Sequence, residues 1–138
     1  MSYRHLEHAT DAVIEVTAPN LTRAFEVAGM SVVETILDPS KIDEKTNFSV
    51  SVQGKDLRYL LYNWLEEIII LTITDGFAIK KMLVEIKKNN QYKIMARVFG
   101  EKIDITKHKF KVEIKSPTFH EMEIQEGEKI TLRYLLDL

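Results

Sequence analysis

Residues 12–37, AVIEVTAPNLTRAFEVAGMSVVETIL, change from the periodicity of a strand to that of a helix. In residues 12–18 the side chains alternate, with Ala12, Ile14 and Val16 on one face, which predicts a strand with one buried side. Pro19 and Asn20 then interrupt the pattern, and asparagine is a favourable helix N-cap. From residue 21 to residue 37 the apolar positions recur at steps of three and four, which predicts an amphipathic helix.

The same two periods continue in the middle of the chain. Residues 48–53 alternate as a second strand. Residues 56–73 carry a wide apolar stripe and predict a second helix, which we expect to anchor the core because each buried aliphatic side chain stabilises the fold by about 1.5–3 kcal/mol. The last turn of this helix, residues 68–71, is apolar on every side. We therefore expect it to be either fully buried or converted early to extended chain.

The second half of the chain predicts a run of strands. Residues 77–88 and 91–100 form two of them, joined by Asn89 and Asn90, which suit the positive φ angles of a tight hairpin. The charged residues 101–111 predict a loop with a short turn of helix. Three further strands are predicted, in residues 113–116, 119–125 and 129–136. This order predicts an α+β fold with two layers, in which a mixed or antiparallel sheet packs against two helices.

Composition predicts an ordinary globular protein. Of the 138 residues, 45% are hydrophobic and 29% are charged, so we expect residues 1–138 to form a single domain. The chain has no cysteine, which excludes disulfides, thiolate metal sites and cysteine nucleophiles. The N-terminal segment has no apolar core of a signal peptide, and no segment approaches the roughly 20 apolar residues of a membrane span. The sequence therefore predicts a cytoplasmic protein that makes no contact with a membrane.

The net charge argues against a protein that binds nucleic acid by itself. The formal net charge is −2, whereas such proteins usually carry a basic excess that neutralises phosphates. Lysines cluster at residues 80–81, 87–88 and 107–115, and we interpret them as solvated strand faces and loops. We therefore expect any contact with RNA to be indirect.

The sequence lacks the common nucleotide-binding and hydrolase motifs. It has no GxxxxGK[ST], GxGxxG or GxSxG segment, which argues against kinases, dehydrogenases and hydrolases of those classes. His5 and His8 lie close to Asp11, and the spacing fits either a metal or acid–base cluster or an ordinary polar surface. A metal-dependent hydrolase that uses His8, Asp11 and His120 stays open as an alternative, although no general base is paired with a nucleophile.

Two aspartates stand at the ends of predicted strands. Asp11 precedes the first strand, and Asp137 is the penultimate residue. If these strand ends are neighbours, their side chains and the terminal carboxylate of Leu138 gather at one place, and such like charges need a cation. An all-oxygen site suits a hard divalent ion such as Ca²⁺ or Mg²⁺. Nothing in the spacing alone brings residue 11 to residue 137.

Four segments, taken in order along the whole chain, resemble the archease family. They are the His8-Ala9-Thr10-Asp11 segment, the helix LLYNWLEE of residues 60–67, the run from Gly100-Glu101 through Lys107-His108 to IKSPTFH of residues 114–120, and the final LLDL of residues 135–138. The chain departs from the family pattern at Ala9-Thr10, where the order Thr-Ala is usual, and at Lys107, where arginine is common. Neither departure removes a carboxylate.

The resemblance implies a function without catalysis by the chain itself. Archeases are accessory proteins of the tRNA-splicing RNA ligase, which joins a 3′-phosphate or 2′,3′-cyclic phosphate end to a 5′-hydroxyl end. They promote its guanylylation by GTP and its multiple turnover. The family's metal site, usually described with calcium, implies Asp11, Asp137 and the main chain of Leu138 as ligands, with His8 orienting a ligand or contacting the partner. The alternative is a chaperone or modulator of other tRNA-modifying enzymes, such as a methyltransferase, with a purely structural metal.

Overall fold

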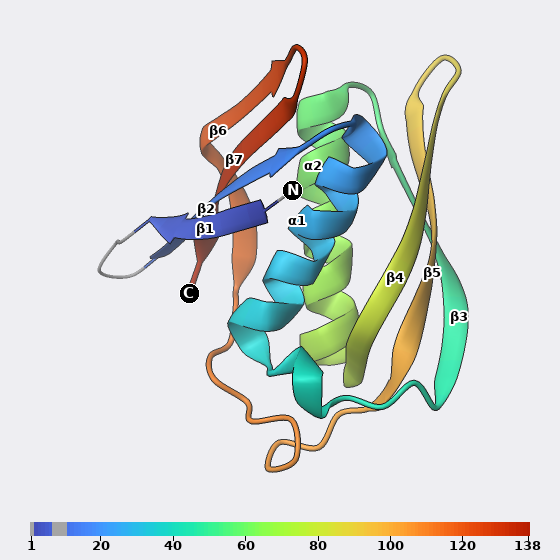
Figure 1. The fold of residues 1–138 in the computed structure, drawn as a ribbon, viewed down its shortest axis with the longest axis vertical. Coiled ribbons are helices and arrows are strands. Elements are labelled where there is room, and N and C mark those ends of the chain that lie inside the picture. Colours follow the sequence, from blue (N-terminus) through green and yellow to red (C-terminus); the bar gives the residue numbers. More distant parts are fainter. Residues whose placement is uncertain (1, 7–10) are drawn as a thin grey trace.

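The computed structural model describes residues 2–6 and 11–138 (Figure 1). This part of the chain forms two α-helices and seven strands. In chain order they are β1 Ser2–Leu6, β2 Asp11–Ala18, α1 Leu21–Ile36, β3 Thr46–Gly54, α2 Leu57–Ile69, β4 Phe77–Lys88, β5 Tyr92–Lys102, β6 Ser116–Glu126 and β7 Ile130–Asp137. A 3₁₀ turn, η1, covers Pro39–Lys41, and a π-helical segment, η2, covers Ile70–Thr74.

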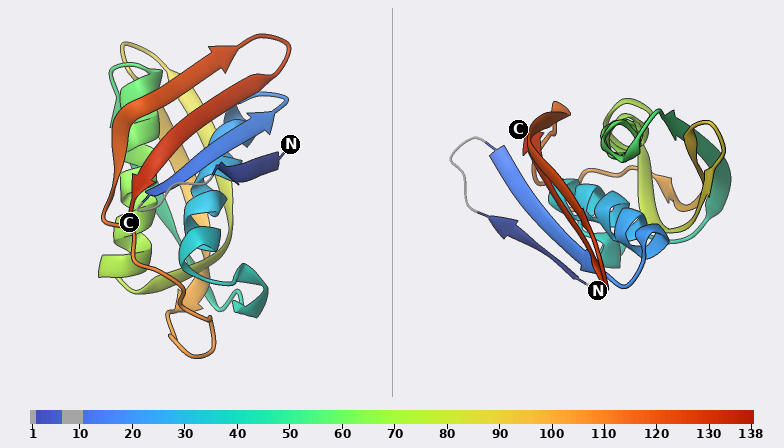
Figure 2. Two further views of the ribbon diagram at one scale, coloured as in Figure 1. Left: turned by 90° about the vertical axis from the view of Figure 1, so that its left-hand side faces the viewer. Right: turned by 90° about the horizontal axis from the view of Figure 1, so that it is seen from above.

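The strands form two antiparallel sheets. One has the order β1-β2-β7-β6 and the other the order β3-β5-β4. The two helices lie side by side between the sheets, as the view from above shows (Figure 2). The predicted α+β class, with antiparallel strands packed against two helices, is confirmed. The division into two sheets was not predicted, because periodicity along the chain gives no information on which distant strands pair.

The core fills the space between the helices and both sheets. Phe25 of α1 and Trp64 of α2 are fully buried, and the indole Nε1 of Trp64 donates a hydrogen bond of 2.8 Å to the carbonyl of Phe25. A Cβ atom on Gly29 would lie 2.8 Å from the Sδ atom of Met82 and 3.1 Å from the Trp64 ring. The glycine inside α1 therefore permits the close approach of α2 and β4, which compensates for its low helix propensity.

Both helices begin at a capping side chain, of which Asn20 was predicted and Asp56 was not. The side chain of Asn20 accepts a hydrogen bond from the Arg23 amide at 2.9 Å, and that of Asp56 accepts one from the Tyr59 amide at 2.9 Å. At the other end of α2 the chain stays helical through η2. Ile70 is 38% exposed there while Leu71 is buried, so the apolar turn is neither fully buried nor extended as predicted.

The structure corrects three strand predictions. β1 was not predicted, because its residues are few and mostly polar. β6 is one continuous strand where two were predicted, in residues 113–116 and 119–125. The strand includes Pro117, because β6 lies at the edge of its sheet, where proline is tolerated. The β4–β5 connection spans residues 89–91, and neither asparagine has the predicted positive φ.

No helix within residues 2–6 and 11–138 combines the length and the hydrophobicity that membrane crossing needs.

Candidate functional site

Pairing of β2 with β7 brings the two predicted aspartates together. The register runs from Asp11 opposite Asp137 to Ala18 opposite Ile130. Core residues such as Ile14 point toward the helices from the even-numbered positions of β2. Because side chains alternate along a strand, Asp11 and Asp137 stand opposite each other on the face turned away from the helices. The meeting of residues 11 and 137, which the sequence left open, is confirmed.

The electrostatics of this pair favour an added cation. Side chains directly opposite in an antiparallel sheet have Cβ atoms roughly 4.5–5.5 Å apart, and like charges at such positions are destabilising. Asp11 and Asp137 are both partly exposed. Among the ion pairs formed within the described residues, none includes either carboxylate. The repulsion is therefore not relieved by a lysine or arginine of that part of the chain.

A third strand completes the row. Ser116 of β6 stands opposite Asp137 on the other side of β7, so its side chain shares the face of the two aspartates. The amide of Lys115 donates a hydrogen bond of 2.8 Å to the main-chain carbonyl of Asp137, which fixes the end of β7. Sequence reasoning did not single out Ser116, although it lies in the segment IKSPTFH that carries part of the family resemblance.

The chemistry of these donors fits a hard divalent cation. Two carboxylates offer up to four oxygens, and Ca²⁺ accepts six to eight oxygen ligands. Within residues 2–6 and 11–138, no group of three or more His, Asp or Glu side chains could hold a metal. Further oxygens would have to come from water and from the main chain, for which Leu138 directly follows Asp137. His8 lies outside the described residues, and its role stays a prediction.

The histidine of the predicted alternative lies apart from this row. His120 is exposed on β6, in the irregular stretch between Thr118 and Glu123. Its amide donates to the hydroxyl of Thr118 at 2.8 Å. Asp11 is level with Ser116, four residues earlier, and a strand rises by about 3.3 Å per residue. The described structure therefore does not bring His120 to Asp11, as a hydrolase using both would require.

A second acidic centre, at Glu101 of β5, is organised differently. The residue is only 6% exposed. Its Oε2 atom accepts hydrogen bonds from Lys107 Nζ at 2.8 Å, from the Asp43 amide at 2.7 Å and from His108 Nε2 at 3.0 Å. His108 is fully buried, and its Nδ1 atom accepts from the Asp104 amide at 2.9 Å. The proton of the neutral imidazole therefore sits on Nε2 and points at Glu101.

These contacts shift the titration of Glu101. The hydrogen bond from Lys107 is the largest cause that holds the pKa of this carboxyl well below its usual range, followed by those from Asp43 and His108. The same cluster ties the loop after β5 to the body of the protein, since the His108 carbonyl accepts the Asp38 amide at 2.9 Å. Sequence reasoning gave Glu101 and His108 no role of their own, because a charged loop offers no periodic signal.

The fold and the site together define a small two-sheet α+β protein that presents an opposed pair of carboxylates where its first long strand meets its last. Comparison with known proteins gives this class a family. The model of the archease protein family (MTH1598/TM1083) matches residues 3–138. Protein archease of Pyrococcus abyssi is 36% identical over 124 residues, which cover 89% of this chain and 87% of that protein. The chain belongs to the archease family.

Solved structures agree with this assignment. The solution structure of Methanobacterium thermoautotrophicum protein 1598 matches with a TM-score of 0.81 at 28% identity, covering 99% of this chain and 98% of that one. The crystal structure of an archease described as a possible chaperone, from Thermotoga maritima, matches with a TM-score of 0.60 at 19% identity, covering 98% of this chain and 96% of that one. At that identity the second match bears on the fold alone.

Proposed function

We propose that this chain is a cytoplasmic accessory factor of the tRNA-splicing 3′-phosphate/5′-hydroxyl RNA ligase. It promotes GTP-dependent guanylylation of the ligase, and hence multiple turnover, through a divalent ion held by Asp11, Asp137 and the main chain of Leu138. The supporting observation is the Asp11–Asp137 pair, two like charges directly opposite in the β2–β7 ladder. Membership of the archease family supports the choice of partner.

Calcium is the ion that this donor set suits best. It accepts carboxylate, carbonyl and water oxygens in flexible geometry, whereas Mg²⁺ demands a near-ideal octahedron. When bound, the ion supplies positive charge for phosphate oxygens, in a reaction class where positioning and charge neutralisation provide most of the catalysis. Asp11 and Asp137 bind and orient it at the end of the sheet. The nucleophile belongs to the ligase, so the chain is not an enzyme in this proposal.

The test compares ligase guanylylation by GTP in the presence of wild-type, Asp11→Asn and Asp137→Asn proteins. Both variants keep the side-chain shape while removing a charge. We expect each to lose at least the roughly 10–100-fold in calcium affinity that removal of a ligand's hydrogen-bond partner costs, and to lose stimulation accordingly. Asp75→Asn is the matched control, because Asp75 is an exposed aspartate in the turn before β4. Circular dichroism checks folding, and calorimetry measures calcium binding. Undiminished stimulation by both folded variants contradicts the metal role.

A chaperone or modulator of tRNA-modifying enzymes, such as a methyltransferase, is the second candidate. The observation that favours it is the exposure of large apolar side chains, among them Leu83 and Ile105. Pull-down from a native extract distinguishes the two candidates. Recovery of the ligase supports the first, and recovery of a methyltransferase without the ligase supports the second. The metal would then be purely structural, and Asp137→Asn would leave partner capture unchanged.

A further inference from the structure

The three-stranded sheet presents an outward face that the fold itself does not use. Toward the helices, β4 and β5 bury residues such as Met82 and Ile94 in the core. On the opposite side, Leu83 of β4 is 60% exposed and Met95 of β5 is 44% exposed. Because burying such side chains in water-free surroundings is favourable, their outward position suits contact with another molecule better than stability of the isolated chain.

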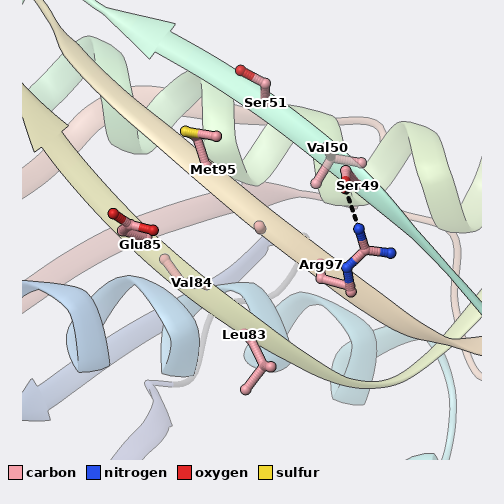
Figure 3. Close-up of a pocket in the computed structure, with 9 residues that line it drawn as sticks. Ser49, Val50, Ser51, Leu83, Val84, Glu85, Met95 and Arg97 are labelled. Atoms are coloured by element: carbon pink, nitrogen blue, oxygen red, sulfur yellow. Dashed lines mark hydrogen bonds between the residues drawn. The ribbon is translucent and has the colours of Figure 1, made fainter.

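These two side chains border a groove of about 430 Å³ (Figure 3). The strand register places Ser51, Met95 and Glu85 in one row across the sheet and Ser49, Arg97 and Leu83 in the next. The floor of the groove is formed by Val50, Val84 and Ala96, which pack against the core. Methionine is flexible and polarisable, a property that suits surfaces which adapt to a partner.

Cations surround this groove. On the outward face of β4 and β5 stand Lys81, Lys87, Lys93 and Arg97. Two carboxylates lie against them, because Glu85 pairs with Lys87 and Glu44 pairs with Lys81, each at 3.5 Å, so the formal charge there is 4 − 2 = +2. The whole chain carries −2, so this face is opposite in sign to the rest of the molecule. We call the outward surface made by Lys81, Leu83, Lys87, Lys93, Met95 and Arg97 the basic-apolar face.

The apolar centre of the groove favours an acidic protein segment over nucleic acid as the partner. Single-stranded nucleic acid binds through aromatic side chains on which bases stack. The aromatic side chain that the outward face of β5 offers, Phe99, is half-buried, and the ammonium of Lys81 lies 5.1 Å from its ring centroid. The centre of the groove is aliphatic instead. Apolar burial combined with neutralisation of negative charge is what an acidic amphipathic protein segment provides.

We propose that the basic-apolar face binds an acidic amphipathic segment of a protein partner. Apolar side chains of that segment cover Leu83 and Met95, and its carboxylates pair with Lys87, Lys93 and Arg97. The face lies on the other side of the helices from the Asp11–Asp137 pair, so both can be occupied at once (Figures 1 and 2). This inference does not depend on the metal site.

The probe is a fluorescent synthetic peptide in which leucines at helical spacing are flanked by glutamates. We expect it to shift amide resonances of β3, β5 and β4, and to bind more weakly as salt is added. Leu83→Ser and Lys93→Glu should each weaken binding at least about tenfold, as at interface hot spots. The matched controls are Ile105→Ser, at a side chain 67% exposed in the loop after β5, and Lys129→Glu, beside β7; both should leave binding unchanged.

Three results would overturn the proposal. The first is the absence of resonance shifts on these strands at millimolar peptide. The second is tighter binding of oligouridine RNA than of the peptide, where Lys93→Glu loses RNA binding and Leu83→Ser keeps it. That result would assign the face to nucleic acid. The third is concentration-dependent dimerisation of the free protein that Leu83→Ser abolishes, which would assign the face to a second copy of the chain.

Discussion

Two acidic centres of this molecule use the same chemical group in opposite ways. Glu101 is buried and accepts hydrogen bonds from an ammonium, an amide and an imidazole, so its charge is satisfied inside the protein. Asp11 and Asp137 are partly exposed, stand opposite each other, and form no ion pair within the described residues. A carboxylate with internal donors stabilises the fold, whereas opposed carboxylates without donors are suited to an external cation.

The contrast predicts opposite responses to the loss of a negative charge. Removal of the negative charge at Glu101 leaves the hydrogen-bond donors around it without a charged acceptor, which lowers the stability of the fold. Removal of the negative charge at Asp137 relieves the repulsion from Asp11, and the loss then falls on the binding of a cation. Substitutions and ligands that act on one centre and not on the other therefore test whether the two centres differ in this way.

The largest effect is expected from Gly100→Ala, next to the Glu101 centre. A Cβ atom at Gly100 would overlap the main-chain carbonyl of Ala78 on β4, opposite the irregularity in register between Ile79 and Lys81. Neither strand can move without loss of its ladder, so we expect destabilisation of more than about 4 kcal/mol. Urea unfolding followed by circular dichroism measures this loss.

Gly127→Ala is the control for that measurement. The nearest atom to a Cβ there is 3.9 Å away, in the turn between β6 and β7, so we expect a change of at most about 0.5 kcal/mol. If Gly100→Ala is as stable as Gly127→Ala, the close approach of β5 to β4 beside Glu101 is not needed for stability.

The next largest effect is the pH dependence contributed by Glu101. Its folded-state pKa lies below the ordinary value of about 4.5, chiefly because of the hydrogen bond from Lys107. Such a group stabilises the folded state above the unfolded pKa, and this contribution is lost as the pH falls from about 4.5 toward the folded-state pKa. We therefore expect Glu101→Gln to lower the Tm clearly at pH 7, with the difference from wild type narrowing below pH 4.5.

Thermal unfolding of both proteins across this pH range checks the expectation. Glu85→Gln is the control, since Glu85 is exposed on the outward face of β4 and forms a 3.5 Å ion pair with the exposed Lys87, a kind of pair that contributes little to stability. A difference between wild type and Glu101→Gln that stays constant from pH 7 to pH 3 would show that the carboxylate charge does not stabilise the loop.

The fold was predictable where local physics decides it. The cap at Asn20, the change of period after Pro19 and the apolar stripe of residues 56–73 located both helices to within a few residues. The pairing of strands was less accessible. The division into two sheets depends on contacts between β2 and β7, and between β3 and β5, that no local pattern encodes. β1 was missed for the related reason that its pairing with β2, and not its own composition, makes it a strand.

The two acidic centres also differ in how far the sequence predicts them. Asp11 and Asp137 could be named from their positions at strand ends and from the family resemblance, and the structure supplied the register that joins them. Glu101 could not be distinguished from its charged neighbours by periodicity. Its burial results from a loop that folds back, so that Lys107 and His108 approach from the C-terminal side and the amide of Asp43 from the other.

Calcium is expected to act only on the opposed pair. A ligand that binds the folded state alone stabilises it by RT ln(1 + [L]/Kd), which is about 2.7 kcal/mol at a concentration one hundred times Kd. We expect calcium to raise the Tm of wild type and of Glu101→Gln by similar amounts, and not that of Asp11→Asn. Differential scanning fluorimetry with and without a chelator measures the shift. An equal shift in Asp11→Asn would place the ion elsewhere.

The smallest effect concerns Asp137→Asn in the absence of metal. With a chelator present, the substitution removes one of two like charges that stand directly opposite, and such cross-strand pairs contribute roughly 0.2–1 kcal/mol. The main-chain bond from the Lys115 amide to the carbonyl of residue 137 does not involve the side chain and is retained. We therefore expect urea unfolding at pH 7 to show unchanged or slightly increased stability, the reverse of Glu101→Gln. A clear loss of stability would mean that the Asp137 carboxylate is satisfied within the protein, and the two acidic centres would then no longer differ in kind.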